Sequence, residues 1–240
     1  MTSRCNLCGG EEFESIKNRE NVQCSGCGSV ERTRVLKLIL DSYGLPRQGQ
    51  RMLHLAPEKG LSGRFRSILG VGYDPVDISP RRYPWEQVRR FDLTTDAEML
   101  EDESYDVVLH MHVMEHIRCD VTAVLFHLHR ALKNGGYHIF CIPVIRGTYA
   151  SDFGEMSREE ATRKFGQHNH VRRFGADDLE MTLGMVFRLP PEYDLTAEYD
   201  SSLLDSFNIP PYARTGWSPH NVLVMRKGDI KLVSAGPASS

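Results

Sequence analysis

The sequence predicts an α/β fold with an open, mostly parallel sheet, preceded by a small metal-binding ribbon. Three observations support this prediction. An apolar strand that begins at Tyr105 changes abruptly into a polar run ending at Ile117. Further apolar strands alternate with amphipathic helices along the chain, which is typical of parallel sheets. Four cysteines lie in the first thirty residues. We expect a ribbon over residues 1–30, a main domain over 31–229 and a flexible tail over 230–240.

Length and charge exclude several classes of protein. At 240 residues the chain can bury one α/β core and carry a small appendage. Its net charge of −3 gives no basic surface for nucleic acid. The first thirty residues do not resemble a signal peptide, and no apolar run reaches membrane-spanning length. We therefore expect a cytoplasmic protein that binds neither nucleic acid nor a membrane.

The cysteines predict a structural zinc site. Two C-x-x-C pairs, each followed by glycine, place four thiolates around one ion: Cys5, Cys8, Cys24 and Cys27. Two alternatives are a pair of disulfides and a redox pair, which suit a secreted chain or a thioredoxin-like context. A ribbon of this length cannot be held together by apolar burial, so zinc would supply most of its folding energy. Cys119 and Cys141 are expected to be ordinary buried or half-buried thiols.

The first half of the main domain alternates helices and strands. A helix is expected after the ribbon, with Ser29 as its N-cap and Gly44 at its end. Strands follow at residues 51–55, 71–78 and 88–91. The loop after the first of these strands reads L-H-L-A-P-E-K-G and ends at Gly60. Since the carboxyl ends of parallel strands share one edge, we expect the residues after these strands to line one site.

The central strand carries the polar run H-M-H-V-M-E-H-I, which places a site at its carboxyl end. His112, Glu115 and His116 also fit the H-x-x-E-H pattern of inverted zinc proteases. That motif needs both histidines one turn apart on a helix. Because His112 lies at or just past the end of a strand, the protease interpretation is disfavoured.

The second half adds a helix over 120–133, whose apolar stripe leaves His127 and His129 facing solvent. A strand over 137–142 follows, and Ser157 begins a capping box that opens a short helix. Further on we expect a helix over 176–184 and strands over 186–189 and 220–227. The loop over 165–175 reads F-G-Q-H-N-H-V-R-R-F-G, and its histidines and arginines indicate function. The alternative is a lid held by internal hydrogen bonds.

Taken as a block, Y-D-V-V, H-V-M-E-H-I and R-A-L-K-N-G-G resemble class I methyltransferases that use S-adenosylmethionine (SAM). The ribbon, the L-H-L-A-P-E loop and F-G-Q-H-N-H-V-R resemble one bacterial subfamily of these enzymes. The resemblance implies a Rossmann-like sheet with an antiparallel last strand. It also implies cofactor contacts at His54, Ala56, Glu58, Gly60, Asp77, Asp92, Leu93 and His110. Asp77 would bind the ribose, with Asp74 as the alternative, while Asp92 and Leu93 would bind the adenine, and Glu58 the ammonium.

The chain departs from this pattern at two places. Most SAM enzymes have a glycine-rich loop after the first strand, of which only Gly60 remains here. In the F-G-Q loop, Asn169 replaces an acid and Phe174 a phenol. An amide does not titrate in the physiological range, whereas His170 does. His170 and His112 are therefore the predicted catalytic bases.

The predicted function is transfer of a methyl group to an oxygen or nitrogen of a small-molecule acceptor, such as a sugar, a polysaccharide precursor or a secondary metabolite. One alternative is a catalytically inactive SAM-binding module that docks a protein partner through its zinc ribbon. Another is different SAM chemistry on the same scaffold, such as cyclisation.

Overall fold

The computed structural model describes residues 3–232, and its centre is a six-stranded sheet in the order β11-β7-β6-β3-β4-β5. All neighbouring strands are parallel except β11, which runs antiparallel to β7. The strands are β3 (Met52–Leu55), β4 (Tyr73–Asp77), β5 (Arg89–Arg90), β6 (Tyr105–Met111), β7 (Leu132–Cys141) and β11 (Val222–Arg226). The predicted α/β class and mostly parallel sheet are thus confirmed.

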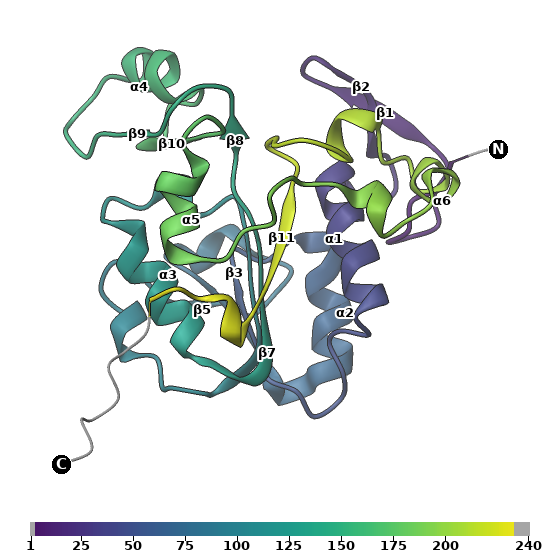
Figure 1. Ribbon diagram of the computed structural model, residues 1–240. Helices are drawn as coiled ribbons and strands as arrows, with labels where there is room; N and C mark the ends of the chain where they lie inside the picture. The colour runs from purple at the N-terminus through teal and green to yellow at the C-terminus, as the bar shows by residue number, and fades with distance from the viewer. Residues whose placement is uncertain (1–2, 233–240) are drawn as a thin grey trace.

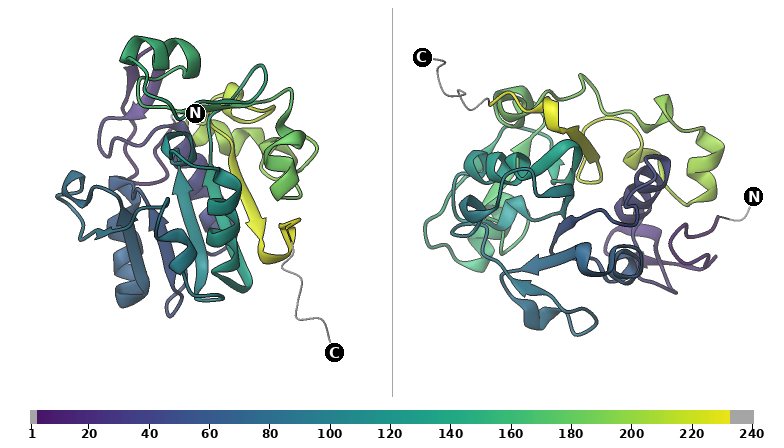
Figure 2. Two further views of the ribbon diagram at one scale, coloured as in Figure 1. Left: turned by 90° about the vertical axis from the view of Figure 1, so that its left-hand side faces the viewer. Right: turned by 90° about the horizontal axis from the view of Figure 1, so that it is seen from below.

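Helices cover both faces of this sheet, so its central strands read as nearly continuous apolar runs. The helices α1 (Glu31–Ser42) and α2 (Lys59–Leu69) cover one face. On the other face lie α3 (Val121–Arg130) and α5 (Leu183–Val186) (Figure 1). The view from below in Figure 2 shows the same three layers. This burial fixes the sheet as a rigid base for the loops at its edges.

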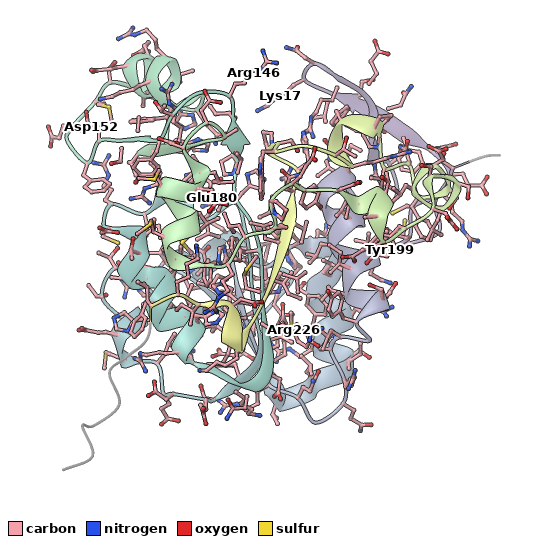
Figure 3. All side chains as sticks on the ribbon, viewed as in Figure 1. Lys17, Arg146, Asp152, Glu180, Tyr199 and Arg226 are labelled. Carbon is pink, nitrogen blue, oxygen red and sulfur yellow. The ribbon has the colours of Figure 1, made fainter. Side chains whose placement is uncertain are left out.

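Two smaller sheets lie above the carboxyl edge of the large one (Figure 1). The ribbon hairpin pairs β1 (Phe13–Ile16) with β2 (Arg19–Cys24). The other small sheet contains β8 (Val144–Ile145), β9 (Ala150–Ser151) and β10 (Arg172–Gly175), with α4 (Arg158–Phe165) beside it. Figure 3 shows Lys17 of the hairpin and Arg146 at the top of the molecule, and both residues are exposed.

Arg34 joins the ribbon to the main domain. Its guanidinium is fully buried and donates to three backbone carbonyls, those of Val22 (2.9 Å), Ser29 (3.0 Å) and Asn208 (2.8 Å). Asn208 follows α6 (Ser201–Ser206), which lies beside the ribbon in Figure 1. These three hydrogen bonds offset part of the cost of burying the charge, and they couple the ribbon, α1 and the later segment.

Short 3-10 helices occupy many of the connections. They are η1 (Gly70–Gly72), η2 (Pro80–Arg82), η3 (Ala97–Met99), η4 (Met114–His116), η5 (Leu179–Met181), η6 (Leu195–Ala197), η7 (Pro211–Ala213) and η8 (Lys227–Asp229). Ser157 caps α4 as predicted, because its hydroxyl accepts from the Glu160 amide at 3.1 Å. Within residues 3–232 there is no helix with the length and apolar character needed to cross a bilayer.

Four local predictions were wrong. The N-cap of α1 is Val30 rather than Ser29, whose side chain points to the cysteines instead. The helix expected over 176–184 is split between η5 and α5. The strand expected over 186–189 is a single bridge between Phe187 and Ile230. His129 is 1% exposed rather than facing solvent. Most of the predicted tail, from residue 233 onward, lies outside the described residues.

Candidate functional site

A cavity of about 610 Å³ opens at the carboxyl edge of the large sheet. Its wall consists of the turns after β3, β4, β5 and β6, together with part of the segment between α4 and β10. The lining residues are Leu55, Ala56, Val76, Asp77, Ile78, Arg82, Tyr83, Phe91, Asp92, Leu93, Thr94, His112, Val113, His116, Ile117, Arg118, Gln167 and Asn169. Open α/β sheets bind their ligands at this edge.

Asp77 ends β4 on the cavity wall, and its carboxylate is held in place by two donors. One oxygen accepts from the Ser79 amide at 2.7 Å, and the other accepts from the Tyr83 hydroxyl at 2.7 Å. Burial and the Asp77 carboxylate raise the pKa of Tyr83, so the phenol keeps its proton and remains a donor. Asp74, the alternative ribose ligand, is instead engaged by Arg89 and by the Tyr105 hydroxyl (2.8 Å) and does not line the cavity.

Asp92 and Leu93 lie on the next part of the wall, directly after β5. One carboxylate oxygen of Asp92 accepts from the Thr94 amide at 3.0 Å, which orients the side chain. Leu93 is buried and contributes an apolar surface beside it. A carboxylate next to an apolar side chain suits a flat heterocycle that carries an amino group.

The loop after β3 sends only part of its side chains to the cavity. Ala56 lines it and has a positive φ of 52°, whereas His54 is fully buried between Tyr73 and Glu58. The two ring nitrogens of His54 lie 2.8 Å from the Tyr73 hydroxyl and 2.8 Å from the Glu58 carboxylate. Glu58 is therefore held toward His54, and neither residue is among those lining the cavity.

Gly60 also serves a contact away from the cavity. A Cβ atom at this position would lie 3.1 Å from Leu7 Cδ2 of the ribbon. Such a distance is too short for an ordinary carbon contact. The missing side chain thus lets the ribbon pack against the start of α2.

His110 lies inside β6 and is fully buried beneath the cavity. Its Nε2 is 3.1 Å from Nε2 of His138 on β7, and its ring stacks on Phe140. Burial lowers the pKa of His110 to about 3, so the ring is neutral. It belongs to the core of the sheet and is not among the residues lining the cavity.

His112 follows β6 with a positive φ of 56° and turns its ring to the cavity wall. Its Nδ1 lies 3.1 Å from a carboxylate oxygen of Glu115, and its Nε2 lies 3.0 Å from the Pro219 carbonyl oxygen. Burial favours the neutral ring, but the Cys141 sulfur and the Glu115 carboxylate outweigh it and raise the pKa of His112 to about 10. Both nitrogens then donate, which leaves no lone pair to accept a proton.

A family model described as a methyltransferase domain matches residues 48–183, which is more than half of the chain and includes all of the residues that line this cavity. The chain belongs to the methyltransferase domain family. Two curated relatives, both named probable S-adenosylmethionine-dependent methyltransferases and from two strains of Mycobacterium tuberculosis, are 27% identical over 187 residues. This match covers 71% of the chain but 63% of each relative, so the chain spans less than two thirds of their length.

Solved structures of methyltransferases also match this methyltransferase domain. A SAM-dependent methyltransferase from Mesorhizobium loti is 16% identical with a TM-score of 0.48, over 83% of this chain and 98% of that one. A phosphoethanolamine N-methyltransferase from Haemonchus contortus, in complex with SAM, is 20% identical with a TM-score of 0.39, over 60% and 34% of the two chains.

A second cluster of side chains in the methyltransferase domain adjoins the cavity, formed by Glu115, His116 and His170. One ligand atom from each lies within 4.8 Å of the others. Glu115 and His116 belong to η4, while His170 comes from the loop before β10. The two rings meet edge to face with centroids 4.7 Å apart. We call this cluster the Glu–His–His cluster.

Arg172 holds the two loops of this cluster together. Its buried guanidinium donates to the carbonyls of Met114 and Cys119, one on each side of Glu115 and His116. The backbone adds a second link, because the Val171 amide donates to the Glu115 carbonyl at 3.0 Å. The H-V-R part of the predicted signature thus fixes the position of His170 relative to η4.

The four ribbon cysteines form a separate cluster whose sulfur atoms lie within 4.8 Å of one another. Cys5 and Cys27 are 3.6 Å apart at their sulfurs, and Cys8 and Cys24 are 3.5 Å apart. The edges of a tetrahedron with metal–sulfur bonds of about 2.3 Å are roughly 3.8 Å long. The arrangement therefore fits a single metal ion.

The structure brings five of the predicted site residues onto one wall: Ala56, Asp77, Asp92, Leu93 and His112. His170 lies beside them against His116, while His54, Glu58, Gly60 and His110 contact other parts of the domain. Sequence reasoning missed His116, Tyr83 and Gln167 as wall residues. The E-H pair after β6 was the available signal for His116. It was considered within a protease motif and within the methyltransferase resemblance, but neither interpretation assigned a role to His116.

Proposed function

We propose that the protein transfers the methyl group of SAM to an oxygen or nitrogen of a small-molecule acceptor. One observation carries the proposal: Asp77, Asp92, Leu93 and His112 share one cavity in a chain of the methyltransferase domain family. The turns after adjacent parallel strands thus offer two carboxylates and an apolar surface to one ligand. This set of groups fits an adenosyl group.

In this proposal Asp77 binds the ribose hydroxyls and Asp92 binds the adenine amino group, while Leu93 covers the ring. Tyr83 acts as a positioning residue, because its hydroxyl fixes one oxygen of Asp77. When bound, SAM supplies a methyl group on a positively charged sulfur, which the acceptor takes while the carbon–sulfur electron pair stays on sulfur. Glu58 as the partner of the ammonium stays a prediction and requires its carboxylate to leave His54.

The protein contributes mainly alignment and exclusion of water in this proposal, since a sulfonium is already a good leaving group. His112 acts as a donor that shapes the wall, because both of its nitrogens are engaged. His170 is then the remaining candidate for removal of the acceptor proton. Its Nε2 lone pair would take that proton.

A polar small molecule suits the acceptor side of the cavity. Arg118, which follows η4, and Gln167 and Asn169, from the loop before β10, line the cavity and carry guanidinium and amide groups. Such donors match the hydroxyls of sugars, of polysaccharide precursors or of hydroxylated secondary metabolites. This acceptor class and a cytoplasmic location stay predictions.

Binding of SAM and of its demethylated product tests the function. We expect Asp77→Asn to weaken SAM binding at least about 10-fold in calorimetry, because a charge-assisted hydrogen bond is worth roughly 1.5–3 kcal/mol. Tyr83→Phe should give a smaller loss. Asp200→Asn is the matched control, since this exposed carboxylate at the N-cap of α6 makes no side-chain capping hydrogen bond and does not line the cavity.

Turnover separates an enzyme from an inactive module. We expect labelled methyl groups to pass from SAM into a small-molecule extract incubated with the full chain. Tight binding of both SAM and its product, with no methyl group consumed by any extract, would favour the inactive SAM-binding module that docks a partner through its ribbon.

We also propose that the cysteine cluster holds structural zinc. The fit of the four sulfurs supports it, and Gly10 adds a backbone donor, because its amide lies 3.4 Å from the Cys8 sulfur. Metal analysis should find one zinc per chain bound by thiolates, and Cys24→Ser should lose it and expose the ribbon to protease. Cys119→Ser, outside the ribbon, should retain the metal.

A further inference from the structure

The Glu–His–His cluster contains two histidine rings whose tautomers are set by the backbone. His116 Nδ1 lies 3.1 Å from the Asn169 carbonyl oxygen, and His170 Nδ1 lies 3.3 Å from the Phe165 carbonyl oxygen. A carbonyl only accepts, so both Nδ1 atoms carry hydrogen. In the neutral ring the lone pair then lies on Nε2, which is the atom available to a metal ion. Histidines that bind metals in proteins are oriented by the same kind of second hydrogen bond.

Glu115 supplies a buried carboxylate to these rings. The residue is 0% exposed; one oxygen accepts from His112, while the other, Oε2, has no hydrogen-bond partner. A buried polar atom without a partner costs about 1–3 kcal/mol, and more when it is charged. The orphaned oxygen thus indicates that a further positive group belongs beside it.

No hydrogen bond joins these three residues in the described structure. His116 Nε2 lies 4.0 Å from the nearer Glu115 oxygen, which exceeds hydrogen-bond distance. Since both sides offer lone pairs, a network of acceptors alone would be repulsive. A cation between them removes the repulsion and satisfies Oε2.

We propose that Glu115, His116 and His170 bind a divalent transition-metal ion whose remaining coordination positions face the cavity and take an oxygen of the methyl acceptor. Two imidazoles and one carboxylate are a common donor set for such ions, and they leave positions open for substrate. Ligand atoms that bind a metal at about 2.1 Å lie roughly 3 Å from one another. Side-chain rotations that move the ligand atoms of this cluster by about 1 Å would bring them to that spacing.

The acceptor role follows from the position of the ion and rests on the proposed function. His116 lines the cavity, as do Gln167 and Asn169 from the loop that carries His170. A cation lowers the pKa of a hydroxyl bound to it, so the proton passes to water in the open cavity. The oxygen then keeps the electron pair that forms the new bond to the methyl carbon. In this arrangement His170 orients the ion and is not itself protonated.

Manganese binding tests the site without any need for turnover. The full chain, with zinc in its ribbon, is titrated with MnCl₂, and free Mn²⁺ is followed by electron paramagnetic resonance. We expect one Mn²⁺ per chain, since thiolates prefer zinc and leave the ribbon occupied. Glu115→Gln and His170→Ala should each weaken binding at least about 100-fold. His168→Ala, an exposed residue of the same loop, is the matched control and should bind as the wild type does.

SAM affinity, measured on the same samples, shows that each variant is folded and separates the two proposals. Absence of Mn²⁺ binding, or binding unchanged in His170→Ala, would overturn the metal site. If SAM still binds and methyl groups are transferred in that case, His170 acts directly on the acceptor and the proposed function survives. Mn²⁺ binding without any SAM binding would instead overturn the proposed function and leave the metal site.

Discussion

The histidines within the sheet differ from those at its carboxyl edge in what their ring nitrogens meet. His110 and His138 meet each other in the core, where burial lowers the pKa of both. His116 and His170 meet backbone carbonyls on one side and a space beside a buried carboxylate on the other. The first pair fills volume and stays neutral, whereas the second pair lies beside the Glu115 carboxylate, and His116 also lines the cavity. Burial and partners, rather than residue type, decide which histidines can do chemistry.

The largest expected effect is a loss of turnover when a histidine at the carboxyl edge of the sheet is replaced. His170→Ala should lower kcat at least about 100-fold, because the acceptor proton then has no assisted route from the site. SAM affinity should stay within about 3-fold, since the proposed cofactor contacts are Asp77, which ends β4, and Asp92, which follows β5, whereas His170 comes from the loop before β10. Steady-state kinetics and calorimetry on the same protein measure both values. A loss of SAM affinity instead would place His170 on the cofactor side, and its proposed role at the acceptor would be wrong.

Strand alternation explains why the sequence could not assign these roles fully. His110 and His112 are two residues apart, and a regular strand would point both to the same side. The strand ends at Met111, and the left-handed backbone of His112 redirects its ring. The pattern predicted a site at this edge, where the structure has a cavity lined by His112. The family resemblance also placed His110 among the cofactor contacts, but this ring is buried against His138 and does not line the cavity.

Other parts were predictable because local chemistry determined them. The apolar runs predicted the parallel strands, and the Ser157 capping box predicted the start of α4. The Glu–His–His cluster was not predictable in this way, because Glu115 and His170 are brought together by long-range contacts of Arg172 and Val171. The burial of His129 likewise depends on Phe187, which packs over α3 from a distant segment.

The sheet histidines should control stability in acid. The pKa of His110 in the folded protein is about 3, below the value of about 6.5 for an unfolded chain. As pH falls below about 6.5, His110 takes up a proton in the unfolded chain but stays neutral in the folded protein. The contribution of the neutral ring to the free energy of unfolding is thus fully present above this pH. It is lost as pH falls toward 3, by at most about 1.4 kcal/mol per pH unit for each such histidine.

The double variant His110→Leu, His138→Leu removes the contribution of the two sheet histidines to the pH dependence of stability, while it keeps the ribbon and the cavity histidines. We expect its free energy of unfolding to fall less steeply than that of the wild type between pH 6.5 and 5, as measured by urea titration. Equal slopes for the two proteins would show that the sheet pair is not the group that titrates.

A smaller effect on stability is expected at His129. This residue lies on α3, but its ring is buried like those of the sheet histidines. Its Nε2 is 3.0 Å from the Lys227 carbonyl, and burial lowers its pKa, so the neutral ring acts as a donor. His129→Leu should cost about 1 kcal/mol of unfolding free energy, the value of one hydrogen bond. Turnover should be unchanged, since the side chain packs against Phe187 away from the cavity.

The smallest effect is expected at His168, which tests whether position within the F-G-Q loop matters by itself. The residue is exposed, does not line the cavity, and is separated from His170 by a single residue. If function depends on the fixed ring of His170 and not on loop charge, His168→Ala should leave turnover, SAM affinity and the denaturation midpoint at wild-type values. A fall in turnover with normal SAM affinity would mean that the exposed ring reaches the acceptor. His168 would then belong with the histidines that take part in the reaction.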